Sequence, residues 1–252
     1  MRKIIKLYLT LSLICWSTVL SAMDERLIKA NAYYSEGMFQ DAIEVYEDIL
    51  KTGMTSPELH YNLGNAYYRN GYLPAAILNF ERALLLAPHD KDIRYNLDLA
   101  YSQITDKIET VEEFFLARWF AAVRGSTDSD HWAIVSIILF VLTFAALFVY
   151  FFSRSTAIRK ITFFMALLFL IGSVTTLSFS YNQKQRLLKQ NRAIVFAPSV
   201  TVRSSPDRSG TELFVLHEGT RVRILQTIGE WYEIELEDGN SGWMQANNLE
   251  TI

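Results

Sequence analysis

The chain has 252 residues, a formal net charge of −3 and 50% hydrophobic residues, so its length leaves room for two small domains beside a membrane segment. The acidic balance argues against a nucleic-acid partner. The single cysteine, Cys15, lies in an N-terminal apolar run, which excludes a disulfide framework, a cysteine-based zinc site and a cysteine nucleophile from the rest of the chain.

The first 22 residues have the layout of a signal peptide. Arg2, Lys3 and Lys6 precede an apolar run over residues 7–20, and the small residues Ser21 and Ala22 follow it. We therefore predict a signal peptide over 1–22. An uncleaved anchor helix is the alternative, and both interpretations place the following segment outside the cytoplasm.

Residues 23–107 contain an internal repeat with an offset of about 34 residues. The sequence from Ala30 to Leu50 aligns with that from Gly64 to Leu84 in its small residues, tyrosines and turn glycines, and Pro88 closes the second unit. This pattern resembles the tetratricopeptide repeat, in which small residues let two helices approach closely. We expect 23–107 to be a helical repeat domain that ends in a capping helix over about Lys91–Lys107.

The repeat pattern also predicts which side chains line the concave face. These are Leu27, Asn31, Tyr34, Tyr61, Asn65, Tyr68, Tyr95 and Leu99. They include no lysine or arginine, so a clamp for a terminal carboxylate is not favoured. An aromatic, asparagine-lined groove still suits an extended peptide or a helix. Alternatively, the tyrosines serve only to pack one repeat on the next.

Residues 108–131 form a predicted amphipathic juxtamembrane helix and turn. Thr110 and Glu113 fit a capping box, and an aromatic run with Trp119, Arg118 and Arg124 follows. This composition is typical of a helix lying on lipid headgroups. The alternative is that the helix packs back on the repeats and covers their last apolar face.

Two uncharged apolar runs follow, over 132–152 and 161–181, and each is long enough to cross a membrane. A short turn over 153–160 joins them and carries Arg154, Arg159 and Lys160, which suits a cytoplasmic turn. The runs contain no ionisable residue, which argues against transport and for an anchor, with helix contacts expected at Gly172 and Ser173.

A basic linker over 182–192 follows the second run and by its charge alone favours the cytoplasm. The predicted signal peptide favours the opposite side of the membrane for this linker. It exports the N-terminal part, and two spans return the chain to the side from which it started. We therefore expect the cytoplasmic (inner) membrane as the location, with both soluble domains facing the periplasm.

Residues 193–252 change to short alternating runs separated by Gly, Pro and Asp, typical of strands. Their order, from Val202 to Trp243, resembles the bacterial Src-homology-3-like (SH3-like) domain. Trp231, Tyr232 and Trp243 form a candidate ligand face, unless they build the barrel itself. The fold class predicted for the whole chain is a multidomain membrane protein: an all-α tetratricopeptide helical repeat, a two-helix transmembrane hairpin and a small all-β SH3-like barrel.

No arrangement of residues typical of catalysis is present in the sequence. The histidines are dispersed, with His217 alone in a predicted turn, and the serines lack the glycines of a nucleophile elbow. No phosphate-binding loop occurs. We therefore expect no catalytic residue, metal ion or cofactor.

The order of signal peptide, repeats, two spans and barrel resembles the BatE-type proteins of aerotolerance operons. The repeats around Tyr33 and Tyr67, the spans from Trp132 and Ile161, and the barrel carry this resemblance. It implies a non-catalytic scaffold of an envelope complex linked to oxygen or stress tolerance. It also implies membrane-anchored von Willebrand-factor-type Bat proteins as partners. Peptidoglycan, bound through the SH3-like domain of a wall-sensing module, is the alternative partner.

Overall fold

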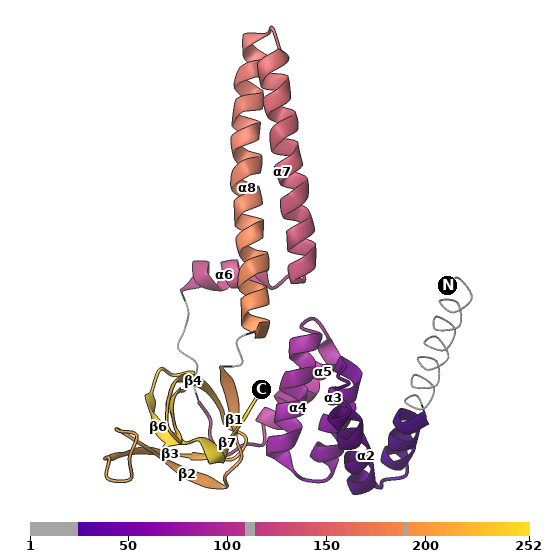
Figure 1. Cartoon of the computed structure of the whole chain (residues 1–252), viewed down its shortest axis with the longest axis vertical. Helices are drawn as coiled ribbons and strands as arrows, with labels where there is room; N and C mark the ends of the chain where they lie inside the picture. Colours follow the sequence, from indigo (N-terminus) through magenta and orange to yellow (C-terminus); the bar gives the residue numbers. More distant parts are fainter. Residues whose placement is uncertain (1–24, 109–113, 189–190) are drawn as a thin grey trace, which may run out of the picture. The chain divides into compact units, whose positions relative to one another are not determined.

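The computed structural model describes residues 25–108, 114–188 and 191–252 of the chain (Figure 1). The predicted signal peptide and the predicted capping box at Thr110 and Glu113 lie outside these residues. The chain divides into two compact units. The repeat–barrel unit comprises the residues up to Thr110 together with Asn191–Ile252, and the hairpin unit comprises Val111–Gln190.

Helices make up the first part of the repeat–barrel unit. They are a helix over residues 25–35, α2 (Phe39–Lys51), α3 (Pro57–Arg69), α4 (Leu73–Leu86) and α5 (Lys91–Tyr101). Gly64 shows why the repeat needs small residues, because a Cβ added there would lie 2.7 Å from the Phe80 ring. The helices enclose a core that includes Tyr46, Leu63 and Ala66.

The second part of this unit is an antiparallel sheet of short strands. The strands are β1 (Arg192–Val195), β2 (Ser199–Arg203), β3 (Glu212–His217), β4 (Arg221–Ile228), β5 (Trp231–Glu235), β6 (Ser241–Gln245) and β7 (Leu249–Thr251), in the order β3-β2-β6-β5-β4-β1-β7. Val195, Val202, Ile234 and Met244 are among the side chains of its buried core.

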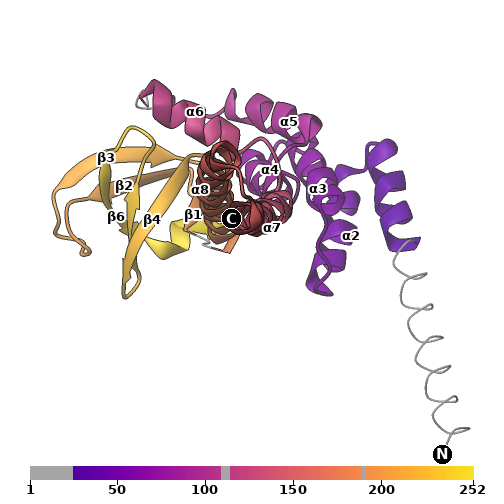
Figure 2. The same ribbon diagram turned by 90° about the horizontal axis from the view of Figure 1, so that it is seen from above.

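The repeats and the barrel share a third core. Ile77 and Leu97 from the helices pack in one buried cluster with Ile194 and Ile252 from the barrel. Both views show α4 between α3 and β1 (Figures 1 and 2), and α4 contacts β1. The barrel therefore covers an apolar side of the repeat helices, a contact that the sequence analysis did not predict.

The helix predicted over Lys91–Lys107 is shorter than expected, since α5 ends at Tyr101. The residues that follow pack on the barrel instead. Ile104 packs into the shared core, and a Cβ added at Gly219, in the turn between β3 and β4, would lie 2.6 Å from Ile104. Gly219 has a φ of +87°, so both its conformation and this close approach require glycine.

The hairpin unit consists of α6 (Phe115–Arg124), α7 (Ser129–Phe152) and α8 (Thr156–Leu188). The hydroxyls of Ser136 and Ser173 each donate to the other residue's backbone carbonyl at 3.0 Å. Gly172 also lets α7 and α8 approach, because a Cβ there would lie 3.2 Å from Leu139. The contact expected at Gly172 and Ser173 is therefore present.

Helix α8 extends beyond the predicted apolar run at both ends, so the turn between the helices is short and part of the basic linker is helical. Lysine, arginine, glutamine and leucine, which fill this linker, favour helix and let α8 continue. α7 and α8 are long and apolar enough to cross a membrane. Together, the helical repeats, the two apolar helices and the antiparallel sheet confirm the predicted fold class.

Candidate functional site

A cavity of about 180 Å³ opens among the repeat helices. It is lined by Tyr34, Asn65, Tyr68, Arg69, Phe80, Asn96 and Leu99. These residues come from the helix over 25–35 and from α3, α4 and α5. Spacings of three and four residues place Asn65, Tyr68 and Arg69 on one side of α3.

Hydrogen bonds from the Asn96 side chain hold one wall of this groove in place. The Asn96 amide donates to Asn65 Oδ1 at 2.7 Å and to the Tyr61 hydroxyl at 3.0 Å. Because Asn96 occupies the carbonyl of Asn65, the amino group of Asn65 is the end of that carboxamide left for a ligand carbonyl. The groove can therefore hydrogen-bond a peptide backbone beside aromatic surfaces.

Three residues that line the cavity were missed by the sequence prediction: Phe80, Asn96 and Arg69. Arg69 is the charged one among them. Its guanidinium lies 5.1 Å from the centroid of the Phe39 ring, in a cation–π contact that holds it beside the cavity. The spacing from Asn65 could have identified Arg69 in the sequence, since a residue four positions along a helix faces the same side. The groove thus carries a cation that the predicted residue set lacked.

The structure brings Tyr34, Asn65, Tyr68 and Leu99 of the predicted set together around the cavity. Gln103 donates to the Tyr68 hydroxyl. The remaining members lie next to the cavity or away from it. Tyr61 packs on Phe80, Asn31 accepts from the Tyr46 hydroxyl at 2.5 Å, Leu27 packs against the first core, and Tyr95 is exposed.

The three aromatic residues predicted as a barrel face do not share one side of the sheet. Tyr232 pairs with the buried Met244 and packs against the barrel core. Side chains alternate along a strand, so Trp231 points to the opposite side from Tyr232. Trp243 is buried, while Trp231 is partly exposed. Of the three, Trp231 is thus the side chain best placed to meet a ligand.

The sequence analysis placed His217 alone in a turn, but in the structure His217 is paired with Asp106. Its backbone N–H donates to Asp106 Oδ2 at 2.7 Å, and its Nδ1 lies 2.8 Å from Asp106 Oδ1. Since a carboxylate can only accept, Nδ1 carries the hydrogen. The Thr220 hydroxyl also donates to Asp106 at 2.7 Å. No sequence signal could find this pair, because 111 residues separate its members.

These hydrogen bonds decide the charge of Asp106. Burial alone would raise its pKa, but the hydrogen bonds from Thr220 and His217 outweigh burial and place the pKa of this carboxyl below its usual value. Asp106 is therefore a carboxylate at neutral pH. It ties the segment after α5 to the turn between β3 and β4.

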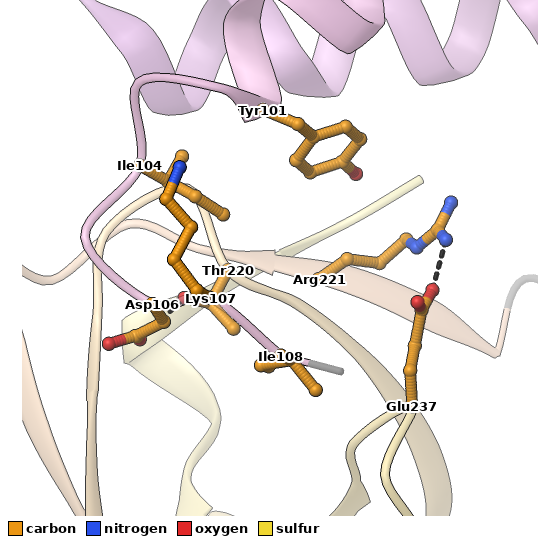
Figure 3. A pocket seen from close by; sticks show the side chains of 8 residues that line it. All are labelled: Tyr101, Ile104, Asp106, Lys107, Ile108, Thr220, Arg221 and Glu237. Carbon is orange, nitrogen blue, oxygen red and sulfur yellow. Dashed lines mark hydrogen bonds and ion pairs between the residues drawn. The ribbon is translucent and has the colours of Figure 1, made fainter. Parts of the chain in front are cut away.

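A second cavity, of about 320 Å³, lies where this segment meets the barrel (Figure 3). Tyr101, Ile104, Asp106, Lys107, Ile108, Thr220, Arg221 and Glu237 line it. Its charged groups already have partners within the chain: Arg221 binds Glu237, and Lys107 Nζ donates to the Ser102 carbonyl at 2.7 Å. Arg221 is therefore held in an ion pair, and Lys107 is held by a hydrogen bond to the backbone.

Beside this cavity lies a buried ion pair between a repeat helix and the barrel. Glu81 on α4 is 2% exposed; its Oε1 accepts from Arg221 Nη1 at 2.6 Å and from the Tyr101 hydroxyl at 2.8 Å. Burial opposes the charge of Arg221, but the Glu81 carboxylate outweighs it and raises the pKa of the guanidinium. Burial and the same carboxylate raise the pKa of Tyr101.

Across residues 25–108, 114–188 and 191–252, no group of three or more His, Cys, Asp or Glu side chains could hold a metal ion. His60, a buried histidine, has its Nδ1 3.0 Å from Asn79 Oδ1 and its Nε2 3.0 Å from the Thr55 hydroxyl. Burial lowers its pKa, so it is a neutral packing residue. What the described residues offer is a small groove with aromatic and amide side chains, and a barrel surface.

Comparison with protein families assigns both modules. Residues 30–71 match the TPR repeat family and residues 57–90 match the tetratricopeptide repeat family. Residues 198–250 match the bacterial SH3 domain family. A search of the curated proteins found no match. Tetratricopeptide repeats and bacterial SH3 domains are interaction domains, not catalytic ones, so this chain is built from two interaction modules and two apolar helices.

Proposed function

We propose that this protein is a non-catalytic, membrane-anchored scaffold that binds partner proteins through the groove of its repeats. The observation that carries the proposal is the cavity itself, where Tyr34 and Tyr68 supply aromatic surface, Asn65 a hydrogen-bonding amide and Arg69 a cation. Such a set suits an extended peptide or a helix with an acidic group. Because the hydrogen bond from Asn96 holds Asn65 in place, little side-chain entropy is lost on binding.

Two features support the anchor. α7 and α8 have the length and composition of membrane spans. The segments before and after them belong to one compact unit, which supports placing both on the same side of the membrane. We propose the periplasmic side of the cytoplasmic membrane, because the predicted signal peptide would export the repeats and the turn at Arg154 and Arg159 suits the cytoplasm.

The more specific assignment rests on the resemblance to BatE-type proteins. We propose that the scaffold belongs to an envelope complex for oxygen or stress tolerance and that von Willebrand-factor-type Bat proteins are its partners. The matched repeats and barrel, in the order repeats, apolar helices and barrel, support this assignment.

The test is crosslinking of the full chain in native membranes, followed by partner identification, with and without Tyr68→Ala. We expect Tyr68→Ala to reduce partner recovery several-fold, because it removes a side chain lining the cavity. Leu86→Ala, an exposed apolar residue at the end of α4 that does not line it, is the matched control. Equal recovery with both variants contradicts the groove as the binding site.

A second candidate function is cell-wall binding through the barrel, favoured by the match of residues 198–250 to the bacterial SH3 domain family. In this reading the barrel holds peptidoglycan peptides at a surface that includes Trp231. The full chain in detergent would be sedimented with purified peptidoglycan. Retention that falls with Trp231→Ala supports this function, and a chain that stays in the supernatant excludes it.

A further inference from the structure

Helix α6 carries a wide apolar face that is exposed among the described residues of the hairpin unit. Five large apolar side chains lie within about 140° of one another at 100° per residue: Phe115, Leu116, Trp119, Phe120 and Val123. The first four are between 46% and 61% exposed. Arg118 and Arg124 flank this apolar side, one at each edge. α6 is therefore amphipathic, with its aromatic side unpartnered.

Contacts with α7 and α8 hold the C-terminal end of α6 at the level where α7 begins. The Trp132 indole N–H, from the first turns of α7, donates to the Arg124 carbonyl at 2.9 Å and so satisfies a carbonyl at the end of α6. The Trp132 ring packs on Phe179 of α8 with centroids 5.3 Å apart. The Gln183 side chain donates to the Thr127 carbonyl at 3.1 Å.

This level is the polar end of the hairpin. On α8, the apolar run ends at Tyr181, and Asn182, Gln183 and Lys184 follow it. Tryptophan and tyrosine at the ends of spans mark the boundary between acyl chains and headgroups. The turn that joins α6 to α7 therefore lies at that boundary, and α6 runs across the direction of α7 and α8 (Figure 1).

We infer that α6 is a lipid-binding helix that lies in the membrane interface, with its aromatic side among the upper acyl segments and Arg118 and Arg124 at the phosphates. This inference rests on the proposed anchoring of α7 and α8. The membrane contact of α6 would run parallel to the surface, in addition to the two helices that cross the membrane.

The lipid surface is the occupant that these observations favour over a protein. A short polar turn over residues 125–131 separates the exposed apolar side of α6 from the apolar residues of α7, and the contacts of Trp132 and Gln183 hold that turn at the level where the apolar run begins. The arginines supply the charge that phosphates of anionic lipids attract. A helix of ten residues is about 15 Å long, which suits a surface element and not a span.

The experiment uses the full chain with Cys15→Ser, reconstituted in vesicles of zwitterionic and anionic phospholipids. Trp119→Cys and Ala121→Cys, on the two sides of α6, are each labelled with an environment-sensitive fluorophore. We expect nitroxide groups on the upper acyl chain to quench the Trp119→Cys label several-fold more than the Ala121→Cys label. Aqueous iodide should quench the two labels in the opposite order.

Two results would overturn the inference. Equal iodide quenching of both labels would place α6 in water, and a Trp119→Cys label shielded from both quenchers would mean that protein covers the aromatic side. A label at Phe148→Cys, which is 62% exposed in α7, reports the anchor separately. If nitroxide lipids fail to quench that label, the spans are not in lipid and the proposed anchoring fails first.

Discussion

The two units of this chain bury polar groups in helix contacts by different chemistry. In the repeat–barrel unit, the Glu81 carboxylate is buried against Arg221 and the Tyr101 hydroxyl. In the hairpin unit, the buried polar groups are the hydroxyls of Ser136, Thr143, Ser173 and Thr176. Each of these four hydroxyls donates to a backbone carbonyl.

This difference reflects the cost of burying a charge in the surroundings of each unit. Arg221 is 31% exposed, so water at its edge offsets part of the cost of burying a charge. In the hairpin, the Ser136 and Ser173 hydroxyls lie 3.3 Å apart within helices made mostly of apolar residues, and a charge there would be far more costly. The large apolar residues are also placed oppositely: Ile77 and Phe80 are buried between the repeats, whereas Phe148 and Phe164 of the hairpin point outward.

Breaking the ion pair should give the largest effect. Arg221→Met removes the partner of a buried carboxylate, and we expect a loss of about 3 kcal/mol in the free energy of unfolding of the repeat–barrel unit. Urea unfolding of the full chain in detergent, followed by tryptophan fluorescence, measures it. Arg208→Met, at an exposed arginine of the barrel, is the control. Comparable losses in both variants would refute the special role of the pair.

A double variant sharpens this result. Adding Glu81→Gln to Arg221→Met removes the unpaired charge, so we expect it to recover part of the lost stability. If the double variant is less stable than Arg221→Met alone, Glu81 stabilises the unit mainly through Tyr101 and not through the arginine.

The Asp106 contact should give a smaller, pH-dependent effect. Its pKa is lower in the folded chain than its ordinary value of 3.8, because Thr220 and His217 donate to the carboxylate. The stabilisation is present above that ordinary value and is lost as the pH falls through the folded pKa. Asp106→Asn should cost about 1 kcal/mol at neutral pH.

Urea unfolding of the full chain at a series of acidic pH values tests this expectation. The stability difference between the parent chain and Asp106→Asn should shrink as the pH falls, because protonation removes the carboxylate from the parent as the substitution does from the variant. A difference that stays constant with pH would mean that the Asp106 charge is not what holds the segment after α5 to the barrel.

The smallest effect is expected in the hairpin. Ser136→Ala removes one of two reciprocal hydrogen bonds between α7 and α8, which we expect to cost about 0.6 kcal/mol. Thr175→Val is the matched control, because the Thr175 hydroxyl bonds only to Ile171 of its own helix. Titration of the full chain with a denaturing detergent, read by fluorescence transfer between labels on α7 and α8, would compare them. A larger loss in Thr175→Val than in Ser136→Ala contradicts the expectation.

Much of the groove was predictable because a helix has a fixed period. The pattern of the first helix of the repeat placed Asn65 and Tyr68 on the predicted concave face, and the cavity includes both. Arg69 was missed because the prediction counted positions from one repeat template. Tyr95 and Leu27 fall outside the cavity since its extent depends on how the neighbouring helices pack.

The sequence by itself determined the local elements: the repeat helices, the two apolar helices and the short strands follow from hydrophobic period, glycine placement and turn residues, which act over a few neighbours. Only the tertiary structure decided that α5 ends at Tyr101, that Asp106 meets His217, and that Ile194 joins the core of the repeats. These contacts join residues about a hundred positions apart, and their free energy comes from burial and hydrogen bonds that exist only once the chain has folded.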